Sequence, residues 1–284
     1  MSKKISTKKK KRQHTPETEM SFWEHIEALR WHFIRSAIAI IIMATLALIY
    51  NEFIFDEIIL APKEQGFITN KLLCWLGNKI NVEYFCLNNL NLKIINTNMS
   101  GQLTTSIWVS IIAGLILAIP YVLWEFWRFV KPALKEKERK YSRGFVFITS
   151  FLFLTGVAFS YFLIVPLTVN FLGTYKVSES VENYISLNSY ISTVTNLSFA
   201  TGLVFEFPIL VYFLTKIGIL TPGFLSKQRR YIIVIILIIA AIITPPDVFS
   251  QIMVSIPLYG LFELSIFISR IAYKRRPVAT VNPK

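Results

Sequence analysis

The sequence predicts an all-α polytopic membrane protein with six transmembrane helices and both termini cytoplasmic. We expect a concave bundle in which the fifth and sixth helices are short. The first reason is composition, because 54% of the 284 residues are hydrophobic and 17% are charged. This balance, with a mean hydropathy of +0.51, is too apolar for a soluble domain. The second reason is the aromatic content of 14%, which is typical of helices that anchor at both faces of a bilayer. The third is a set of six apolar runs.

These six runs define the expected spans, since a bilayer core of roughly 30 Å needs about 20 mainly apolar residues per helix. They cover residues 33–50, 103–126, 145–172, 190–214, 231–243 and 249–268. The last two are shorter and are separated by a segment with Pro245 and Pro246, which forces a sharp break. Single prolines within four of the spans predict bent helices and a curved bundle. They are Pro120, Pro166, Pro208 and Pro257.

The distribution of positive charge predicts the orientation. Of 30 Lys and Arg residues, 25 lie in the segments on the side of the two termini, and five lie on the opposite side. Segments rich in Lys and Arg stay in the cytoplasm, so we expect both termini there, most simply at a bacterial inner (plasma) membrane. An organellar membrane stays open. The net charge of +13 does not indicate nucleic-acid binding, because the basic residues are spread between apolar runs rather than gathered in an aromatic-lined groove.

The expected organisation is one membrane domain between two tails. Residues 1–20 would be a disordered basic cytoplasmic tail, 21–270 the six-helix domain and 271–284 a second cytoplasmic tail. The long first external loop is expected to carry short amphipathic helices. It contains Cys74 and Cys86, which would lie on the oxidising side of the membrane. The two cysteines could form a disulfide or remain as two unpaired thiols, and both alternatives are kept.

Three carboxyl groups lie within the apolar runs, where an ionisable side chain costs on the order of 3 kcal/mol and needs an explanation. We interpret Glu125, near the end of the second run, and Glu263, in the sixth, as interfacial or helix-packing groups. Glu206 lies deep in the fourth run, two residues before Pro208. We interpret it as a functional group that hydrogen-bonds a partner or water. The alternative is a protonated carboxyl that satisfies the carbonyls freed by Pro208.

The sequence contains no enzyme signature. It has no G-x-S-x-G, H-E-x-x-H or C-x-x-C motif and no glycine-rich phosphate loop. His14, His25 and His32 lie in or beside the N-terminal tail, and we interpret them as interfacial, because no acidic or Cys ligand completes a metal site. We therefore expect no enzymatic activity, no metal and no cofactor.

The segment before the first span has helical amphipathicity. Phe22, Ile26 and Leu29 fall on one side of a helix over residues 21–30, which we expect to lie along the membrane surface.

The same side of the membrane carries acidic residues among basic ones. Glu27, before the first span, and Glu138, after the second, can converge on a cationic peptide, since carboxylates accept paired, charge-assisted hydrogen bonds from guanidinium groups. The alternative is local salt bridges with Arg30 and Arg139, which contribute little at an exposed surface.

Motifs spread over nearly all of residues 21–270 resemble the TatC family. H-I-E-A-L-R at 25–30 resembles the family's H-L-x-E-L-R element, and F-E-F-P at 205–208 resembles its fourth-helix F-E-x-P. W-E-F-W at 124–127, P-A-L at 132–134 and E-R at 138–139 resemble its first cytoplasmic loop. T-P-P-D-V-F-S-Q at 244–251, followed by I-P at 256–257 and F-E at 262–263, is similar to the family's most diagnostic stretch.

The resemblance implies a receptor that binds the twin-arginine signal peptides of folded precursors and assembles partners for export driven by the proton-motive force. The signal-peptide site would contain Glu27, Arg30, Pro132, Leu134, Glu138 and Arg139. The intramembrane and partner-docking residues would be Glu206, Pro208, Thr244, Asp247 and Gln251. The implied partners are TatA- and TatB-type single-span subunits, twin-arginine precursors, membrane lipid and further TatC copies.

Two positions depart from the family pattern. The family often has Glu immediately before Leu-Arg, where this chain has Ala28, so Glu27 lies one step earlier and about 100° around the helix. Arginine also often follows two places after Arg30, where this chain has His32.

The main alternative to a translocase receptor is a solute or ion transporter with Glu206 as a proton-carrying site, which would work in liposomes without partner subunits.

Overall fold

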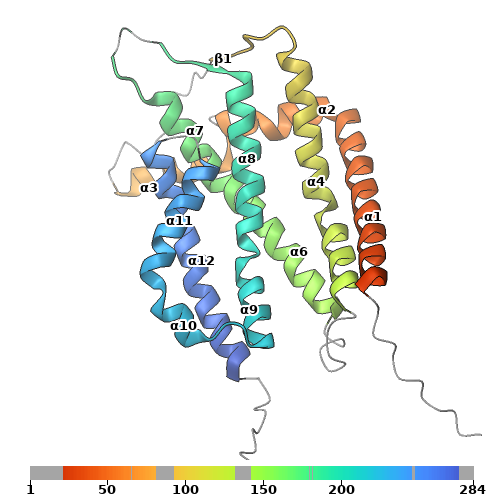
Figure 1. The fold of residues 1–284 in the computed structure, drawn as a ribbon. Coiled ribbons are helices and arrows are strands. Elements are labelled where there is room, and N and C mark those ends of the chain that lie inside the picture. Colours follow the sequence, from red (N-terminus) through yellow and green to blue (C-terminus); the bar gives the residue numbers. More distant parts are fainter. Residues whose placement is uncertain are drawn as a thin grey trace, which may run out of the picture.

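A computed structural model describes residues 22–64, 66–80, 93–131, 142–178, 180, 182–244 and 247–274. Its longer helices are α1 (Phe22–Ile49), α3 (Ile68–Ile80), α4 (Gly101–Val130), α6 (Ser142–Phe159), α7 (Val165–Thr174), α8 (Leu187–Phe205), α9 (Phe207–Ile217), α11 (Arg229–Ile243) and α12 (Val248–Lys274). The shorter elements are α2 (Asn51–Phe53), η1 (Ile54–Ile59), η2 (Ala61–Lys63), β1 (Lys93–Ile95), η5 (Ser160–Ile164), β2 (Tyr184–Ser186) and α10 (Pro222–Lys227). Figure 1 shows that α1 begins and α12 ends at the same end of the molecule, which we call the terminal end. The opposite end is called the loop end.

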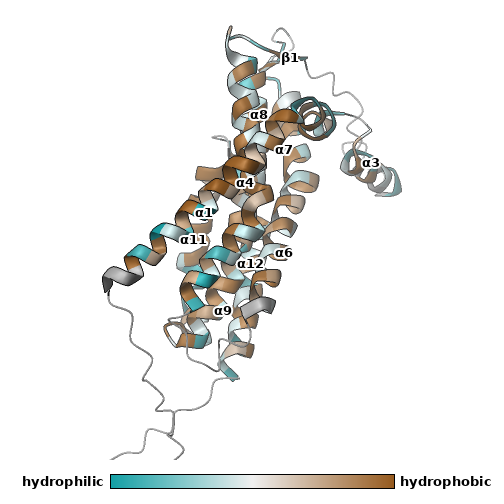
Figure 2. Ribbon diagram, turned by 90° about the vertical axis from the view of Figure 1, so that its right-hand side faces the viewer, coloured by the Kyte–Doolittle hydropathy of each residue, from teal (hydrophilic) through white to brown (hydrophobic). Residues whose placement is uncertain are grey.

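Five helical segments of the described chain are long and apolar enough to cross a membrane. They are Ile26–Ile49, Gly101–Val130, Gly144–Thr174, Leu187–Ile217 and Ser250–Lys274, and hydrophobic residues predominate along them (Figure 2). The predicted fifth span corresponds to α11, whose 15 residues extend about 22 Å at 1.5 Å per residue. It is therefore shorter than a bilayer core of roughly 30 Å. The chain is an all-α polytopic membrane protein.

Two helices extend past their predicted bounds. α1 is continuous from Phe22 to Ile49, so residues 22–30 prolong the first span and do not form a separate helix along the membrane surface. No proline or glycine interrupts this segment. α12 has 27 residues and ends at Lys274, so the sixth helix is not short. The residues beyond the predicted end at 268 include Arg270 and Lys274, which suit the aqueous interface and end the apolar run.

The four prolines of the spans have different effects. Pro208 accompanies a break, since α8 ends at Phe205 and α9 begins at Phe207. Pro166 follows the π-helical turn η5, in which the hydrogen-bond spacing widens. Pro120 and Pro257 lie inside α4 and α12, which continue through them. The structure thus has a break or an irregular turn at two of the four prolines.

Close approaches between helices occur at glycines. A Cβ added to Gly114 of α4 would lie 2.5 Å from the Cα of Ala44 in α1. Between α6 and α8, a Cβ added to Gly156 would lie 3.0 Å from the Cα of Gly202. Small residues let helix backbones approach closely, and such van der Waals packing is a main source of helix association in lipid.

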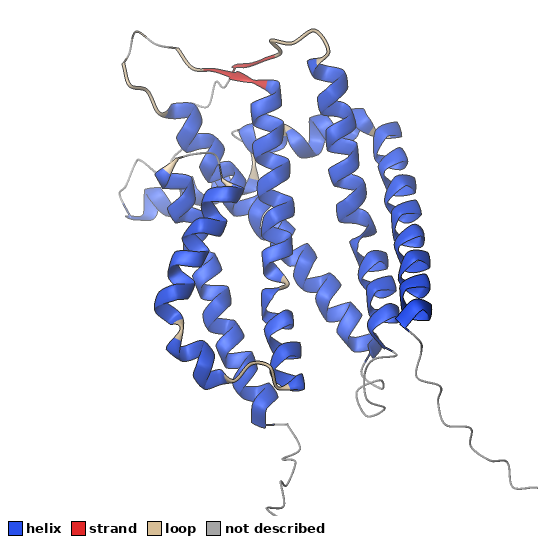
Figure 3. Cartoon of the chain, in the orientation of Figure 1, coloured by secondary structure: helices blue, strands red, loops and turns tan. Residues whose placement is uncertain are grey.

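The π-helix η1, which follows α1 and α2, is bonded to two of the other spans. Its carbonyls at Ile58 and Ile59 accept hydrogen bonds from the hydroxyls of Tyr161 (2.8 Å) and Tyr190 (2.9 Å). Tyr161 belongs to η5 and Tyr190 to α8, so these bonds tie the connection between α1 and α4 to the third and fourth spans. The strands β1 and β2 pair in parallel and join the α1–α4 connection to the α7–α8 connection (Figure 3).

The connection between α1 and α4 contains α3, whose apolar and polar residues fall on different faces, as expected of a short amphipathic helix there. The Thr69 hydroxyl donates to the carbonyl of Phe162 in η5, and the ring of Phe67 stacks on that of Phe162 at 5.8 Å. Cys74 of α3 is disulfide-bonded. Cys86 lies outside the described residues, so the pairing of Cys74 with Cys86 stays a prediction.

Candidate functional site

The predicted signal-peptide residues fall into two groups. Glu27 and Arg30 lie on the first turns of α1 at the terminal end, and both side chains are exposed. No ion pair forms between these two described residues, so the local salt bridge considered for them is not observed. The other predicted residues, Pro132, Leu134, Glu138 and Arg139, lie outside the described residues.

A buried carboxylate lies beside this end of α1. Glu125 of α4 is only 1% exposed, and its Oε2 contacts the Nδ1 of His32 in α1 through a hydrogen bond. Its Oε1 accepts hydrogen bonds from the Tyr121 hydroxyl at 3.2 Å and from Arg128 at 3.3 Å. Three donors from two helices therefore surround one carboxylate, as a buried charge requires.

Aromatic rings flank the same group. The guanidinium of Arg128 lies 5.0 Å from the centroid of the Trp124 ring, and the edge of the His32 ring meets Phe129 at 6.1 Å. From the sequence, His32 was interpreted as a group at the membrane interface and Glu125 as an interfacial or helix-packing group. The two residues were not predicted to form a pair. The sequence feature that could have indicated the pair is that both residues lie near the same end of two consecutive spans.

Glu206 occupies the break between α8 and α9. Its backbone carbonyl accepts from the amides of Ile209 and Leu210, both at 3.1 Å, so it ends one helix and starts the next. Pro208 follows within the first turn of α9. The Oε1 of Glu206 is buried and has no hydrogen-bond partner among the described residues. In the alternative role, this carboxyl would donate to the carbonyls freed by Pro208. The Oε1 atom makes no such hydrogen bond in the described chain.

Among the predicted docking residues near the fifth span, Gln251 bonds α12 to α11, and Asp247 and Thr244 make local bonds at the helix ends. The Oδ1 of Asp247 accepts from the backbone amide of Ser250 at 2.6 Å and caps the start of α12. The Nε2 of Gln251 donates to the Leu237 carbonyl of α11 at 3.0 Å. Thr244 is buried, and its hydroxyl donates to a carbonyl one turn earlier. Pro245 and Pro246 lie outside the described residues.

An ion pair closes the other end of this hairpin. Arg229, the first residue of α11, donates to the Oε2 of Glu263 in α12 at 2.8 Å. The Tyr259 hydroxyl donates to the Oε1 of the same carboxylate at 3.1 Å. Glu263 therefore packs helix against helix, which is one of the two roles expected for it.

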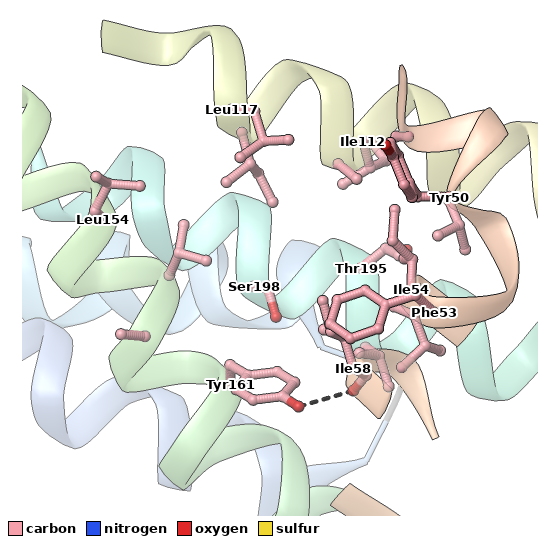
Figure 4. Close-up of a pocket in the computed structure, with 18 of the residues that line it drawn as sticks. Tyr50, Phe53, Ile54, Ile58, Ile112, Leu117, Leu154, Tyr161, Thr195 and Ser198 are labelled. Carbon is pink, nitrogen blue, oxygen red and sulfur yellow. Dashed lines mark hydrogen bonds between the residues drawn. The ribbon is translucent and has the colours of Figure 1, made fainter. Parts of the chain in front are cut away.

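A pocket of about 510 Å³ opens between α1, η1, α4, α6 and α8 (Figure 4), within the size range of ligand pockets. Its described lining is almost entirely apolar and contains no carboxylate, histidine, cysteine, lysine or arginine. The polar groups include Thr195, which accepts from Trp108 at 3.3 Å, and Ser198, whose buried hydroxyl has no partner in the described chain. Such a pocket suits apolar ligands.

The described residues thus offer surfaces for binding. An exposed carboxylate and an arginine lie at the terminal end, a buried carboxyl oxygen lacks a partner at the α8–α9 break, and the pocket is apolar. No three His, Cys, Asp or Glu residues in the described ranges lie close enough together to hold a metal ion.

Comparisons with known proteins cover nearly the whole chain. Residues 24–257 match the family model for the Sec-independent protein translocase protein (TatC). The Sec-independent protein translocase protein TatC of Blattabacterium sp. subsp. Periplaneta americana (strain BPLAN) is 43% identical, over 91% of this chain and 98% of that protein. TatCy of Bacillus subtilis (strain 168) is 32% identical, over 90% of this chain and 91% of its own length.

The solved structures that resemble this chain belong to the same family as these relatives. A crystal structure of the twin-arginine translocase receptor TatC has a TM-score of 0.69 and 32% identity, over 88% of this chain and 99% of that one. A second crystal structure of this receptor, in DDM, has a TM-score of 0.71 and 34% identity, over 87% and 99%. The chain belongs to the TatC family and is a membrane-embedded component of a Sec-independent protein translocase.

Proposed function

We propose that this chain is the receptor and core subunit of a twin-arginine translocase. It binds the twin-arginine signal peptides of folded precursor proteins and assembles TatA- and TatB-type single-span subunits, with further TatC copies, for export driven by the proton-motive force. The observation that carries the proposal is the similarity to two crystal structures of the twin-arginine translocase receptor TatC, each matched over 99% of its length. The activity is transport and involves no catalysed chemical reaction.

The proposed location is a bacterial inner membrane with both termini in the cytoplasm. Two observations support it: α1 begins and α12 ends at one end of the molecule (Figure 1), and most Lys and Arg residues lie in the segments on that side. Reporter fusions test the orientation. A reporter active only in the cytoplasm should work at either terminus, and activity of a periplasm-specific reporter at either terminus contradicts it.

The proposed peptide site uses two carboxylates, one on α1 and one in the stretch of sequence after α4. Glu27 is exposed on α1, and Glu138 follows α4 in the chain. A guanidinium presents a planar fork that pairs with both oxygens of a carboxylate, whereas a lysine ammonium does not. The site should therefore distinguish a pair of arginines from a pair of lysines, although the charge is the same.

Binding of labelled peptides to the purified chain in nanodiscs tests this site. A twin-arginine peptide should bind and photo-crosslink to the loop that carries Glu138, and its twin-lysine analogue should not. Glu138→Ala should weaken binding roughly tenfold or more, since hydrogen bonds to charged groups contribute about 1.5–3 kcal/mol. The matched control is Glu52→Ala, which removes an exposed carboxylate at the loop end. Unchanged binding by Glu138→Ala would remove that residue from the site.

Glu206 is proposed to act after peptide binding, in the assembly of partner helices. Its support is the buried Oε1 atom that has no partner in the described chain, at a break made with Pro208. An unpaired buried oxygen is costly, and a donor from another chain would remove that cost. The α11–α12 hairpin, with Thr244, Asp247 and Gln251, is proposed as the neighbouring docking surface, because α11 is too short to cross an undistorted bilayer.

The variant Glu206→Ala distinguishes signal-peptide binding from the later assembly of partner helices. We expect twin-arginine peptide binding to stay at the wild-type level while export of a folded precursor and co-purification of partner subunits are lost. Wild-type export by this variant would return Glu206 to a packing role. Reduced peptide binding would instead place it in the receptor site.

A further inference from the structure

The helix α3 carries an exposed apolar stripe. Ile68, Leu72 and Trp75 follow one another at helical spacing, so they lie on one side of the helix. Their side chains are 67%, 54% and 59% exposed. A row of large apolar side chains that stays exposed marks a surface that another molecule covers.

Other residues at the start of α3 fix the helix against the third span. Thr69 and Asn70 are buried, and the Thr69 hydroxyl donates to the carbonyl of Phe162 in η5. The ring of Phe67, one residue before α3, stacks on Phe162 and meets the Tyr161 ring edge-on at 5.6 Å. These contacts hold α3 in one orientation, in which its apolar stripe is left uncovered.

The attachment point places α3 beside a membrane span. Phe162 lies inside the spanning segment Gly144–Thr174, twelve residues before its loop end, so α3 begins alongside that span and not beyond it. Figure 2 shows the helix standing to one side of the bundle, closer to the terminal end than β1 is. On the span itself, Phe162 and Leu163 are 42% and 39% exposed. The stripe therefore adjoins an apolar surface that the span presents to lipid.

Two lysines accompany the stripe. Lys71 and Lys79 are exposed, and the Lys79 ammonium lies 5.3 Å from the centroid of the Trp75 ring. The sequence of α3 contains no Asp or Glu, so its positive charge suits the phosphates of lipid headgroups. A tryptophan ring beside a lysine, with an apolar body and a polar tip, is typical of the boundary between hydrocarbon and water.

We propose that α3 is an interfacial anchor, which seats Ile68, Leu72 and Trp75 among the phospholipids of the leaflet at the loop end. A partner helix fits this stripe less well, because helices associate in lipid through small residues that allow close approach, and none of the three is small. The proposal goes beyond the proposed function, since it concerns how the α1–α4 connection is held at the membrane whether or not a signal peptide is bound.

Photo-crosslinking of the full chain in nanodiscs tests the proposal. The discs contain phosphatidylethanolamine and phosphatidylglycerol and are large enough for several copies of the chain, so that a second copy can compete with lipid. A photoreactive benzoylphenylalanine takes the place of Leu72 or of Trp75, and mass spectrometry identifies what is attached after illumination. The matched control has the same residue at Met99, a fully exposed apolar position in the loop before α4, which lies farther toward the loop end than α3 (Figure 1).

We expect attached phospholipid at both α3 positions and none at Met99. Fluorescence of the natural side chain gives a second measurement, because the emission of the wild-type chain minus that of Trp75→Phe isolates Trp75 among the six tryptophans. Lipids that carry a nitroxide near the headgroup should remove most of this emission, since the ring would lie at that depth. Iodide in the buffer should remove little of it.

Three results would overturn the proposal. The first is a crosslink from α3 to a second copy or within the chain in place of lipid, and the second is equal lipid crosslinking at Met99. The third is emission from Trp75 that iodide removes and the lipid nitroxides do not. None of these results bears on the receptor function, which fails separately if the chain does not prefer the twin-arginine peptide to its lysine analogue.

Discussion

Replacing Gly114 with alanine tests how the first span is held against the second. The added Cβ would lie 2.5 Å from the Cα of Ala44 and 2.8 Å from its Cβ. Non-bonded carbons prefer separations of about 3.5–4.0 Å, so the two backbones must separate by roughly 1 Å. The nearest atoms belong to the α1 backbone, and no change of rotamer can move them away.

The expected cost follows from two opposing effects. Inserting a methyl group into a packed contact costs typically about 1–3 kcal/mol. Alanine is the better helix former, which offsets up to about 1 kcal/mol. We therefore expect Gly114→Ala to lower the free energy of unfolding by roughly 1–2 kcal/mol and to loosen α1 before the other spans, because α1 has few other buried residues.

Thermal or denaturant unfolding in detergent micelles measures this change. The matched control is Gly260→Ala in α12, where a Cβ would meet no atom within 4 Å. That variant gains helix propensity without a clash, so its stability should be unchanged or slightly higher. If Gly114→Ala proves as stable as Gly260→Ala, the close approach does not hold α1, and the reasoning from backbone distance is wrong.

Three further substitutions probe other contacts. Tyr190→Phe removes the hydroxyl that donates to the Ile59 carbonyl at 2.9 Å. We expect the free energy of unfolding to fall by about 1–2 kcal/mol and hydrogen exchange in η1 to become faster. Unchanged exchange would mean that other contacts hold this loop. Ser186→Ala removes the N-cap of α8 and should cost about 1 kcal/mol in thermal unfolding, with Ser186→Asp as the capping control. Gly202→Ala should cost less than Gly114→Ala, because the atoms at 2.8 and 2.9 Å are side-chain ends; an equal loss of stability would contradict this ranking.

The spans could be located from the sequence because lipid permits few solutions. A segment in hydrocarbon must be helical, apolar and about 20 residues long, and each of these properties is local. The third and fourth spans were predicted at 145–172 and 190–214, and the structure has Gly144–Thr174 and Leu187–Ile217. The helices exceed the apolar runs by one to three residues at each end, because polar side chains can prolong a helix into the interface.

Contacts between distant segments could not be predicted in this way. β1 and β2 contain three residues each, too few for an alternating pattern to show. His32 and Glu125 lie 93 residues apart, and each has an adequate local explanation as an interfacial group, so neither segment indicates the pair. The half of the proposed peptide site that contains Glu138 lies outside the described residues, and it stays a prediction.

Glu125 and Glu206 show why an intramembrane carboxyl cannot be assigned from its depth alone. Both occur in apolar helices beside aromatic residues, and in sequence they differ mainly in the proline that follows Glu206. In the structure Glu125 accepts hydrogen bonds from three side chains, whereas the buried Oε1 of Glu206 accepts none from the described residues. Both oxygens of Glu125 are already satisfied within the chain, whereas a carboxyl with an unused buried oxygen is stabilised by any donor that reaches it. This difference supports the proposal that Glu206, rather than Glu125, meets a partner helix.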